Sequence, residues 1–363
     1  MQKKKKLCLV IPSLHSGGME RVMSQLAQYF SVIESLESHM ILYGRKPELF
    51  YNIPDEIILH LPKNSFNNWI RLLSTISRLF FLRNKIIELR PDIILSFGER
   101  WNSFVLISVL GLSFPVFISD RCSPTKNLGY LHEILRRILY KKAAGIIIQT
   151  QKAMDIYKLR FKNVRFAVIG NPIREIPQLE SLTKENIILT VGRIIPSKNH
   201  SKLIDSFLKL NMPDWKLYIV GGNALRMNLL EELRAKVNSL GASDRIKLTG
   251  SVRDVDQYYR MSKIFVFTSE SEGFPNVIGE AMAASLPVVS FDCMAGPSDM
   301  INDGVNGFLI EMNNYPRLED RLRLLMCNPD LINEIGIEAR RSIKRFSVEK
   351  MGGSYLKFIT NKL

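Results

Sequence analysis

The stretch Glu270-Ser-Glu-Gly-Phe-Pro-Asn-Val-Ile-Gly-Glu-Ala-Met-Ala-Ala284 decides the fold of this chain, because it joins a buried strand to a helix. It follows the apolar run Ile264–Phe267, which is typical of a strand buried on both faces of a parallel sheet. The order of residues predicts Glu272 in the loop above the strand end and Glu280 in the second turn of the helix. Open α/β sheets bind ligands at such strand ends, against a helix N-terminus. The two carboxylates are therefore candidates for gripping the hydroxyls of a sugar or ribose. The alternative is a pair of solvated surface glutamates.

The same alternation of strand and helix runs through the whole chain. Apolar strand-like runs are followed by amphipathic helical stretches in both halves, which predicts βαβ units and parallel sheets. A length of 363 residues exceeds one ordinary core. We therefore expect an α/β protein with two doubly wound Rossmann-like domains.

The hinge between these domains is predicted at Gly170-Asn171-Pro172, because glycine frees the backbone and proline fixes it. This places the first domain at residues 1–170 and the second at 171–345. The remaining residues, 346–363, contain a helix near Val348–Thr360 that is expected to cross back onto the first domain.

Composition excludes several classes of protein. Hydrophobic content of 46% and charged content of 23% are those of a soluble globular protein. The four cysteines lie far apart, without a CxxC pair or Cys/His cluster, which argues against a zinc site or disulfide framework and fits a reducing compartment. The uncharged stretch Trp101–Ser119 contains serines, a glycine and a proline, so it is expected to form a helix and a strand and not a membrane span. The apolar run after Lys3–Lys6 is too short for a signal peptide and is expected to be the first strand.

The positive charge is concentrated in the first half of the chain. Residues 1–172 hold 25 lysines and arginines against 12 acids, a net +13, whereas residues 173–363 hold 25 against 23, a net +2. Nucleic acid, an anionic membrane or an anionic substrate would attract such a surface. Because no nucleic-acid-binding motif is present, we expect no nucleic acid partner. A membrane surface or a diphosphate-bearing lipid fits better.

A helix predicted at Trp69–Leu89 belongs to this basic half and carries four cations. One interpretation is an amphipathic helix whose apolar residues face the core. The other is that it joins Lys3–Lys6, Arg136-Arg137 and Lys141-Lys142 in a surface for anionic lipid headgroups.

Two loops offer groups that can hold phosphate. Arg193 and Lys198 follow the strand that ends at Val191, where two cations could clamp a diphosphate. In the first domain, Gly17-Gly18 follows the first strand and precedes a helix, so its backbone N–H groups could approach a phosphate closely. The glycines do not form the GxGxxG fingerprint, which argues against a dinucleotide enzyme.

Further loops are expected at the same strand ends. Glu99-Arg100 and Asp120-Arg121 each put a carboxylate and a guanidinium where a substrate would bind, although either could instead form an internal ion pair. His15 lies beside the Gly-Gly loop. Asp254-Val-Asp256 could hold a metal, but aspartate before a helix is common as a structural cap, so we expect no metal ion and no cofactor. The adjacent Arg253 is a candidate for packing against a nucleotide base.

Taken together, these motifs resemble glycosyltransferase family 4, the retaining enzymes with the GT-B fold, of the type that builds bacterial surface polysaccharides. The similarity is most specific between residues 187 and 310 and looser in the first domain. It rests on the following segments: Gly17 to Arg21, Gly192-Arg193 with Lys198-Asn199, Gly221-Gly222, Leu248 to Val252, Ser269 to Ala283 and Gly304 to Phe308.

The resemblance implies that two such domains face each other across a cleft, with the donor nucleotide sugar in the second domain and the acceptor in the first. Glu280 would accept hydrogen bonds from ribose, and Glu272 would face the donor sugar. Arg193 and Lys198 would neutralise the departing diphosphate. Backbone N–H groups near Phe274 and Asn276, with Val277, would complete the donor site, which Gly17-Gly18 would approach. The acceptor side would hold His15, Glu99, Arg100 and Arg121.

One position departs from the family pattern. Many members carry a histidine where this chain has Asp120, so Asp120 is expected to accept a hydrogen bond from the donor sugar or to orient the acceptor. No covalent nucleophile is evident, and retention is expected through same-face attack on an oxocarbenium-like state.

The expected function is therefore sugar transfer from a nucleotide-sugar donor to a saccharide acceptor. The donor is expected to be a UDP-hexose or UDP-N-acetylhexosamine, and the acceptor a lipid-linked saccharide in O-antigen, capsule or lipopolysaccharide assembly. The enzyme would work in the cytoplasm, peripherally at the inner face of the cytoplasmic membrane. The rival enzyme class is a nucleotide-sugar epimerase of the same fold, and the rival from another class is a basic nucleic-acid-binding protein.

Overall fold

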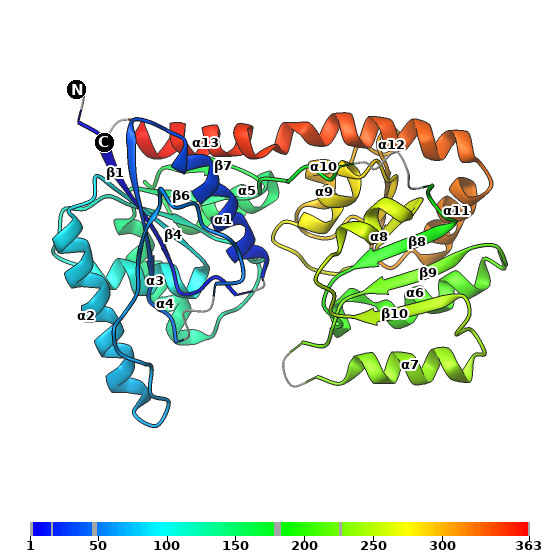
Figure 1. Cartoon of the computed structure of the whole chain (residues 1–363), viewed down its shortest axis with the longest axis horizontal. Coiled ribbons are helices and arrows are strands. Elements are labelled where there is room, and N and C mark those ends of the chain that lie inside the picture. Colours follow the sequence, from blue (N-terminus) through cyan, green and yellow to red (C-terminus); the bar gives the residue numbers. More distant parts are fainter. Residues whose placement is uncertain (1–2, 16, 46–48, 178–182, 225–226, 362–363) are drawn as a thin grey trace. The chain divides into compact units, whose positions relative to one another are not determined.

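The computed structural model describes residues 3–15, 17–45, 49–177, 183–224 and 227–361. The chain divides into two compact units, each with its own parallel sheet (Figure 1). Unit 1 comprises Met1–Pro172 together with Val348–Leu363, and unit 2 comprises Ile173–Ser347. The sequence predicted the breaks after residues 170 and 345.

The sheet of unit 1 has seven parallel strands in the order β3-β2-β1-β4-β5-β6-β7. Its central strands are apolar and buried on both faces, as doubly covered parallel strands require. The strands are β1 (Lys5–Ile11), β2 (Leu36–Leu42), β3 (Ile58–His60), β4 (Ile93–Phe97), β5 (Val116–Ser119), β6 (Gly145–Ile148) and β7 (Phe166–Val168).

Helices cover both faces of this sheet with separate cores. One face packs against α1 (Gly18–Ser31) and the C-terminal α13 (Val348–Thr360), which lie side by side (Figure 1). The other face packs against α2 (Arg71–Leu89), α3 (Glu99–Ser108), α4 (Tyr130–Leu139) with the short η1 (Tyr140–Lys142), and α5 (Gln151–Arg160). The last helix therefore completes the first unit.

The sheet of unit 2 has six parallel strands in the order β10-β9-β8-β11-β12-β13. Helices pack against both of its faces and form two further core clusters. The strands are β8 (Ile187–Val191), β9 (Lys216–Val220), β10 (Ile246–Gly250), β11 (Ile264–Phe267), β12 (Val288–Phe291) and β13 (Phe308–Ile310). The helices are η2 (Pro196–Lys198), α6 (His200–Lys209), α7 (Leu229–Ser239), α8 (Asp256–Met261), α9 (Asn276–Ala283), α10 (Pro297–Met300), α11 (Tyr315–Met326), α12 (Pro329–Ile343) and η3 (Lys344–Phe346).

The predicted fold class, two doubly wound parallel-sheet domains, is confirmed. The uncharged stretch between residues 101 and 119 forms most of α3, a turn and β5, and no helix in the described ranges is both long and apolar enough to cross a membrane. Helix α12 was not predicted from the sequence, and its apolar residues complete both cores of unit 2.

Candidate active site

The β8 and β11 loops of unit 2 are joined by hydrogen bonds, because these two strands are neighbours in the sheet. Glu270 donates its backbone N–H to the carbonyl of Ser197 at 2.9 Å. The Asn199 amide donates to the Glu270 carboxylate at 3.0 Å and to the Thr268 carbonyl at 3.1 Å. The two loops therefore form one rigid platform at the carboxyl ends of their strands.

Lys198 and Glu272 form an ion pair on this platform. The Lys198 ammonium lies 2.5 Å from Glu272 Oε1, which also accepts a hydrogen bond from the Ser269 hydroxyl at 2.9 Å. The ammonium lies 4.8 Å from the centre of the Phe267 ring. The side chains of Lys198 and Glu272 remain 16% and 20% exposed, so solvent or a ligand can reach both. The structure thus brings together two residues that the sequence placed in different loops.

Arg193 and Arg253 are exposed cations of unit 2. Within the described part of the chain, neither side chain makes a hydrogen bond or ion pair. Arg193 follows β8 and therefore lies in the same loop as Lys198. Both guanidinium groups are available to an anionic ligand.

Glu280 lies in the second turn of α9, as predicted, and is buried. Its Oε2 accepts a hydrogen bond from the Tyr259 hydroxyl at 3.0 Å. Its Oε1 lies 3.9 Å from Nε of Arg174, whose guanidinium is also paired with the Asp256 carboxylate. Sequence reasoning missed Arg174 and Tyr259, because the signal for them is their place in the fold and not a local motif.

The Asp254-Val-Asp256 motif has internal partners. Asp254 accepts the backbone N–H of Asp256 at 3.0 Å and lies 3.6 Å from the Arg260 guanidinium. Asp254 therefore accepts the N–H of the first residue of α8, although the N-cap position itself is Val255, which makes no side-chain capping hydrogen bond.

The turn before α9 differs in part from the expected donor site. The Phe274 side chain is buried against Phe346, with ring centres 5.5 Å apart. The backbone N–H of Asn276 donates to the Phe274 carbonyl at 3.0 Å, so it is engaged within the turn. Val277 is half-buried in the first turn of α9.

Gly296 packs closely against this turn. Its φ is +105°, and a Cβ there would lie 2.1 Å from Cδ of Pro275. Only glycine fits this position, which the sequence analysis did not identify.

In unit 1, the Gly-Gly loop is held by Tyr51. The Tyr51 hydroxyl donates to the Gly17 carbonyl at 3.0 Å and accepts the Gly17 N–H at 3.3 Å. Helix α1 begins at Gly18, directly after this loop, as expected. His15 is half-buried immediately before it. A pocket of about 400 Å³ extends from Tyr51 to Leu59 beside this segment.

Asp120 lies in an internal network at the end of β5. Its carboxylate pairs with Arg136 at 3.0 Å and accepts hydrogen bonds from Asn102 at 2.9 Å, Tyr140 at 2.7 Å and Tyr157. Burial, followed by the Asp120 charge, raises the pKa of both tyrosines well above its usual value, so they stay protonated donors. The sequence left two roles open for this loop, and these contacts favour the internal ion pair over a catalytic role. They also remove Arg136 from the predicted basic surface, because it is buried.

Glu99 is also turned inward. Its carboxylate accepts the backbone N–H groups of Arg121 and Cys122. The Glu99 pKa is raised above its usual value, mainly by burial and then by the nearby Asp120 charge. These hydrogen bonds act in the opposite direction but do not reverse the shift. The adjacent Arg100 is exposed, and its side chain makes no hydrogen bond or ion pair within the described ranges.

Arg121 links β5 to the predicted hinge segment. Its guanidinium lies 3.8 Å from the centre of the Phe97 ring and donates to the Asn171 side-chain oxygen at 2.6 Å. Gln149 donates to the same oxygen at 2.5 Å. Burial lowers the Arg121 pKa. The contacts fix Asn171 just before the boundary of unit 1.

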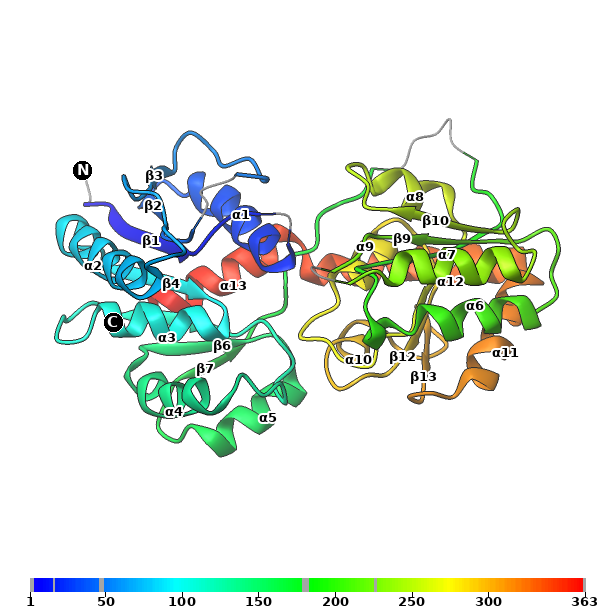
Figure 2. The ribbon, with the colours of Figure 1, turned by 90° about the horizontal axis from the view of Figure 1, so that it is seen from below.

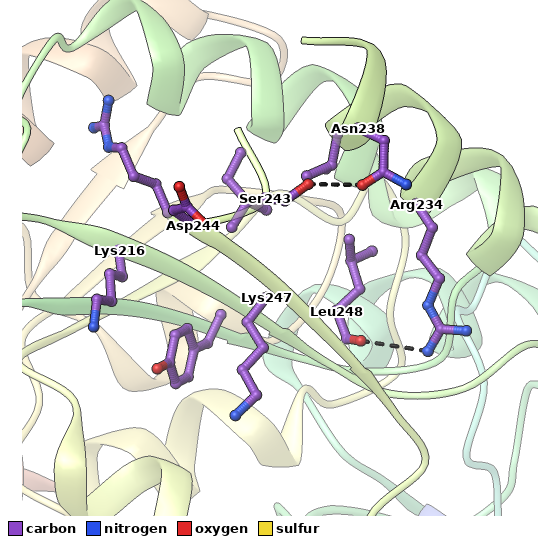
Figure 3. A pocket seen from close by; sticks show the side chains of 11 residues that line it. Lys216, Arg234, Asn238, Ser243, Asp244, Lys247 and Leu248 are labelled. Carbon is purple, nitrogen blue, oxygen red and sulfur yellow. Dashed lines mark hydrogen bonds between the residues drawn. The ribbon is translucent and has the colours of Figure 1, made fainter. Parts of the chain in front are cut away.

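A separate pocket of about 360 Å³ lies beside the edge strand β10 (Figure 3). It is lined by Arg234, Lys247, Lys216 and Asp244, among others. The Ser243 hydroxyl, also in the lining, donates a hydrogen bond to the Asn238 side-chain oxygen. None of its lining residues belongs to the predicted site. We place the candidate active site at the β8 and β11 loops, where the acid and cation of the ion pair meet.

Comparisons with known proteins agree with this fold. Residues 171–342 match the family model "Glycosyl transferases group 1". The C-terminal half therefore belongs to that family, and the protein is a glycosyltransferase. The epimerase alternative finds no support.

Two relatives come from Campylobacter jejuni. One is 26% identical over 98% of each chain and is an alpha-1,4-N-acetyl-D-galactosaminyltransferase named for a saccharide on PP-undecaprenol. The other is 28% identical over 98% of this chain and 99% of its own, and is named a 4-alpha-N-acetylgalactosaminyltransferase acting on a diphospho-undecaprenol-linked saccharide. Among solved structures, HepE of Anabaena in complex with UDP has a TM-score of 0.80 at 18% identity, covering 99% of this chain and 100% of its own. Both Campylobacter relatives are therefore named for transfer to a saccharide linked to undecaprenol through a diphosphate.

Proposed function

We propose that the protein is a retaining glycosyltransferase that moves a hexose or N-acetylhexosamine from a UDP-sugar to a saccharide carried on a lipid diphosphate. The observation that carries this proposal is the Lys198–Glu272 ion pair on the platform formed by the β8 and β11 loops. The exposed Arg193 lies in the same β8 loop as Lys198. The names of the Campylobacter relatives support the lipid-linked acceptor, and the UDP complex of a structural neighbour supports the nucleotide.

The chemistry assigned to the platform begins with the leaving group. Cleavage of the donor bond builds negative charge on the diphosphate, and fixed cations near that charge lower the barrier. An ammonium has three N–H donors, so Lys198 can keep Glu272 as one partner and offer the others to phosphate oxygens. Arg193 adds a planar fork for paired oxygens. These two cations perform the neutralisation that a metal ion performs elsewhere, and the proposed mechanism uses no metal.

Glu272 and Glu280 are assigned to the donor's hydroxyl groups. Glu272 has one oxygen, Oε2, without a partner among the described residues, and this oxygen can accept a bond from the sugar. The buried Glu280 is oriented by Tyr259 and can accept from the ribose. Neither is proposed as a nucleophile. The acceptor hydroxyl attacks from the face that the diphosphate leaves, and a phosphate oxygen takes its proton.

The proposal extends to the acceptor and to the place where the enzyme works. We assign the acceptor to unit 1, near Gly17-Gly18 and His15, and place the enzyme peripherally at the cytoplasmic face of the membrane. O-antigen, capsule or lipopolysaccharide assembly would consume the product. The excess positive charge of residues 1–172 supports this placement.

A thermal-unfolding panel of nucleotide sugars tests the donor site, because a ligand that binds the native state raises its stability. We expect one UDP-sugar to give the largest shift and the Arg193→Ala and Glu280→Ala variants to lose most of it. An unchanged shift in both variants would show that the site lies elsewhere. Transfer of that sugar to a lipid-linked acceptor, with the anomeric configuration of the product read by NMR, then tests activity and retention.

A further inference from the structure

Helix α2 carries two apolar stripes on opposite sides. The stripe that packs on the sheet is narrow and consists of Leu82, Ile86 and Leu89, with the buried Arg78 on the same face one turn earlier. The opposite stripe is exposed, beginning with Trp69, which is 97% exposed just before the helix. It continues through Leu72, Leu73, Ile76, Phe80 and Ile87, which recur at helical spacing on one face. The sequence left open whether these residues are core, and the structure places most of them outside it.

Helix α4 repeats this arrangement. Arg136 and Leu139 are buried, while an apolar stripe faces solvent. That stripe consists of Tyr130, Leu131, Ile134 and Ile138, of which Leu131 is 68% exposed. Single exposed apolar residues are ordinary, but contiguous ones mark an interaction surface.

The two exposed stripes belong to one layer of unit 1. Helix α3 packs against α2 on one side and α4 on the other, and Figure 2 shows the three helices side by side. Both outer helices start after the carboxyl end of a strand, α2 after β3 and α4 after β5. Because all strands are parallel, Trp69 and Tyr130 begin their stripes at the edge of the sheet that also carries the Gly17-Gly18 loop.

The exposed cations of this layer include Arg71 at the start of α2 and Arg137, Lys141 and Lys142 at the C-terminal end of α4 and in η1. The acids of the two helices are already paired, Glu88 with Lys85 at 2.6 Å and Glu133 with Arg136 at 3.1 Å. A second copy of this face would therefore meet like charge, whereas an anionic lipid surface would be attracted.

We propose that the exposed stripes of α2 and α4 form the surface by which unit 1 binds an anionic lipid bilayer. The apolar side chains enter the boundary between headgroups and acyl chains, and the flanking cations contact headgroup phosphates. Trp69 and Tyr130 lie at the ends of the helices, and such aromatic rings favour the interface between lipid and water. Resting on the proposed function, this surface would hold the acceptor edge of unit 1 next to a lipid-borne diphosphate.

Vesicle sedimentation tests the surface with a matched pair of variants. Leu131 and Ile337 are both 68% exposed, but Ile337 lies on α12 of unit 2. With vesicles of equal parts phosphatidylglycerol and phosphatidylcholine, we expect a Leu131→Ser/Ile138→Ser variant to bind at least about tenfold more weakly than the unmodified protein, since two apolar side chains no longer insert. Ile337→Ser should bind as the unmodified protein does, and phosphatidylcholine alone should bind the unmodified protein weakly.

Tryptophan fluorescence provides a second measurement that does not depend on the α4 variant. The chain has three tryptophans, and Trp69 is the most exposed of them. Its emission should shift to the blue on adding anionic vesicles, and Trp69→Phe should abolish most of the shift while leaving the melting temperature unchanged.

The outcomes separate this proposal from the proposed function. Equal binding by Leu131→Ser/Ile138→Ser and Ile337→Ser, or equal binding to neutral and anionic vesicles, would overturn the membrane surface. A dimer in solution that the α4 variant dissociates would instead identify a second copy as the occupant. If no nucleotide sugar binds, the proposed function fails while vesicle binding is unaffected. If the exposed stripes of α2 and α4 bind the bilayer, Leu131→Ser/Ile138→Ser keeps its activity on a water-soluble acceptor and loses its activity on the lipid-linked acceptor.

Discussion

The two units each place a carboxylate and a cation at the end of a parallel strand, and they use the pair differently. In unit 1 the Asp120 and Arg136 side chains are both 3% exposed. In unit 2 the Lys198 and Glu272 side chains are 16% and 20% exposed. The difference comes from the covering helices: α4 and α5 supply Arg136 and Tyr157 to enclose Asp120, whereas the β11 loop leaves Glu272 open. Cover by helices therefore distinguishes the enclosed acid of unit 1 from the accessible acid of unit 2.

The largest expected effect is on the stability of unit 1. Asp120→Ala would break the buried ion pair and leave Arg136 with only the partly exposed Glu133 as an ion-pair partner; breaking a buried pair costs about 3–5 kcal/mol. Chemical denaturation should show this loss as a lower midpoint. Replacing both residues in Asp120→Ala/Arg136→Leu should recover part of the stability, because the buried charge that lost its partner is removed as well. A stable, inactive Asp120→Ala protein would instead support the catalytic role that the sequence predicted.

The next effect is on catalysis in unit 2. Lys198→Ala should lower kcat about 100- to 1,000-fold, since it removes a cation proposed to face the leaving diphosphate. Its free energy of unfolding should change by about 1 kcal/mol or less, because Glu272 stays accessible to water. Lys209→Ala, on the exposed side of α6 and 3.9 Å from Glu319, is the matched control and should keep full activity. Similar losses in both variants would contradict the assignment.

A third effect concerns the response of unit 2 to acid. Burial, with a smaller contribution from Lys198, lowers the pKa of His200 from 6.5 to about 4. The folded state therefore favours the neutral imidazole ring. The contribution of His200 to the free energy of unfolding is fully present above pH 6.5 and is lost as the pH falls toward 4. The difference corresponds to about 3 kcal/mol at the acid end. In denaturation curves at several pH values, the free energy of unfolding of His200→Gln should fall less steeply between pH 6.5 and 4 than that of the unmodified protein. Equal slopes would show that His200 does not cause the loss of stability in acid.

The smallest expected effect is on nucleotide binding. Tyr259→Phe removes the hydrogen bond that orients Glu280, which is worth about 1 kcal/mol, so the Kd for UDP should rise about fivefold. Calorimetry with UDP and its 2′- and 3′-deoxy analogues should show the loss only for nucleotides whose hydroxyl reaches Glu280. Tyr258→Phe is the control, because the Tyr258 hydroxyl makes no hydrogen bond in the described part of the chain. Equal weakening of all the nucleotides would place Glu280 away from the ribose.

Local sequence patterns predicted much of the fold and part of the site. The strand before Glu270 and the helix at Asn276 were recognised from periodicity and a proline turn, and both are present. The order of strands and loops also placed Lys198 and Glu272 at the same sheet edge. Arg174 and Tyr259 were missed, because they reach Glu280 from segments far away in sequence.

The outward face of α2 was ambiguous for a related reason. Helical periodicity shows that apolar residues share a face, but it does not show which face meets the sheet. The structure sets Leu82 and Ile86 against the sheet and leaves Leu72 and Leu73 exposed. A helix with apolar residues on two faces can be oriented only by the packing around it.

The sequence by itself determined that this chain forms two doubly wound sheets and that acids and cations follow their strands, because strand burial and turn chemistry are local properties. Only the tertiary structure decided which of these charges are enclosed and which stay open, as Asp120 and Glu272 show. The physical reason is that a charge beside a strand end is desolvated or exposed by helices from elsewhere in the chain, and their contacts arise only when the sheet has assembled.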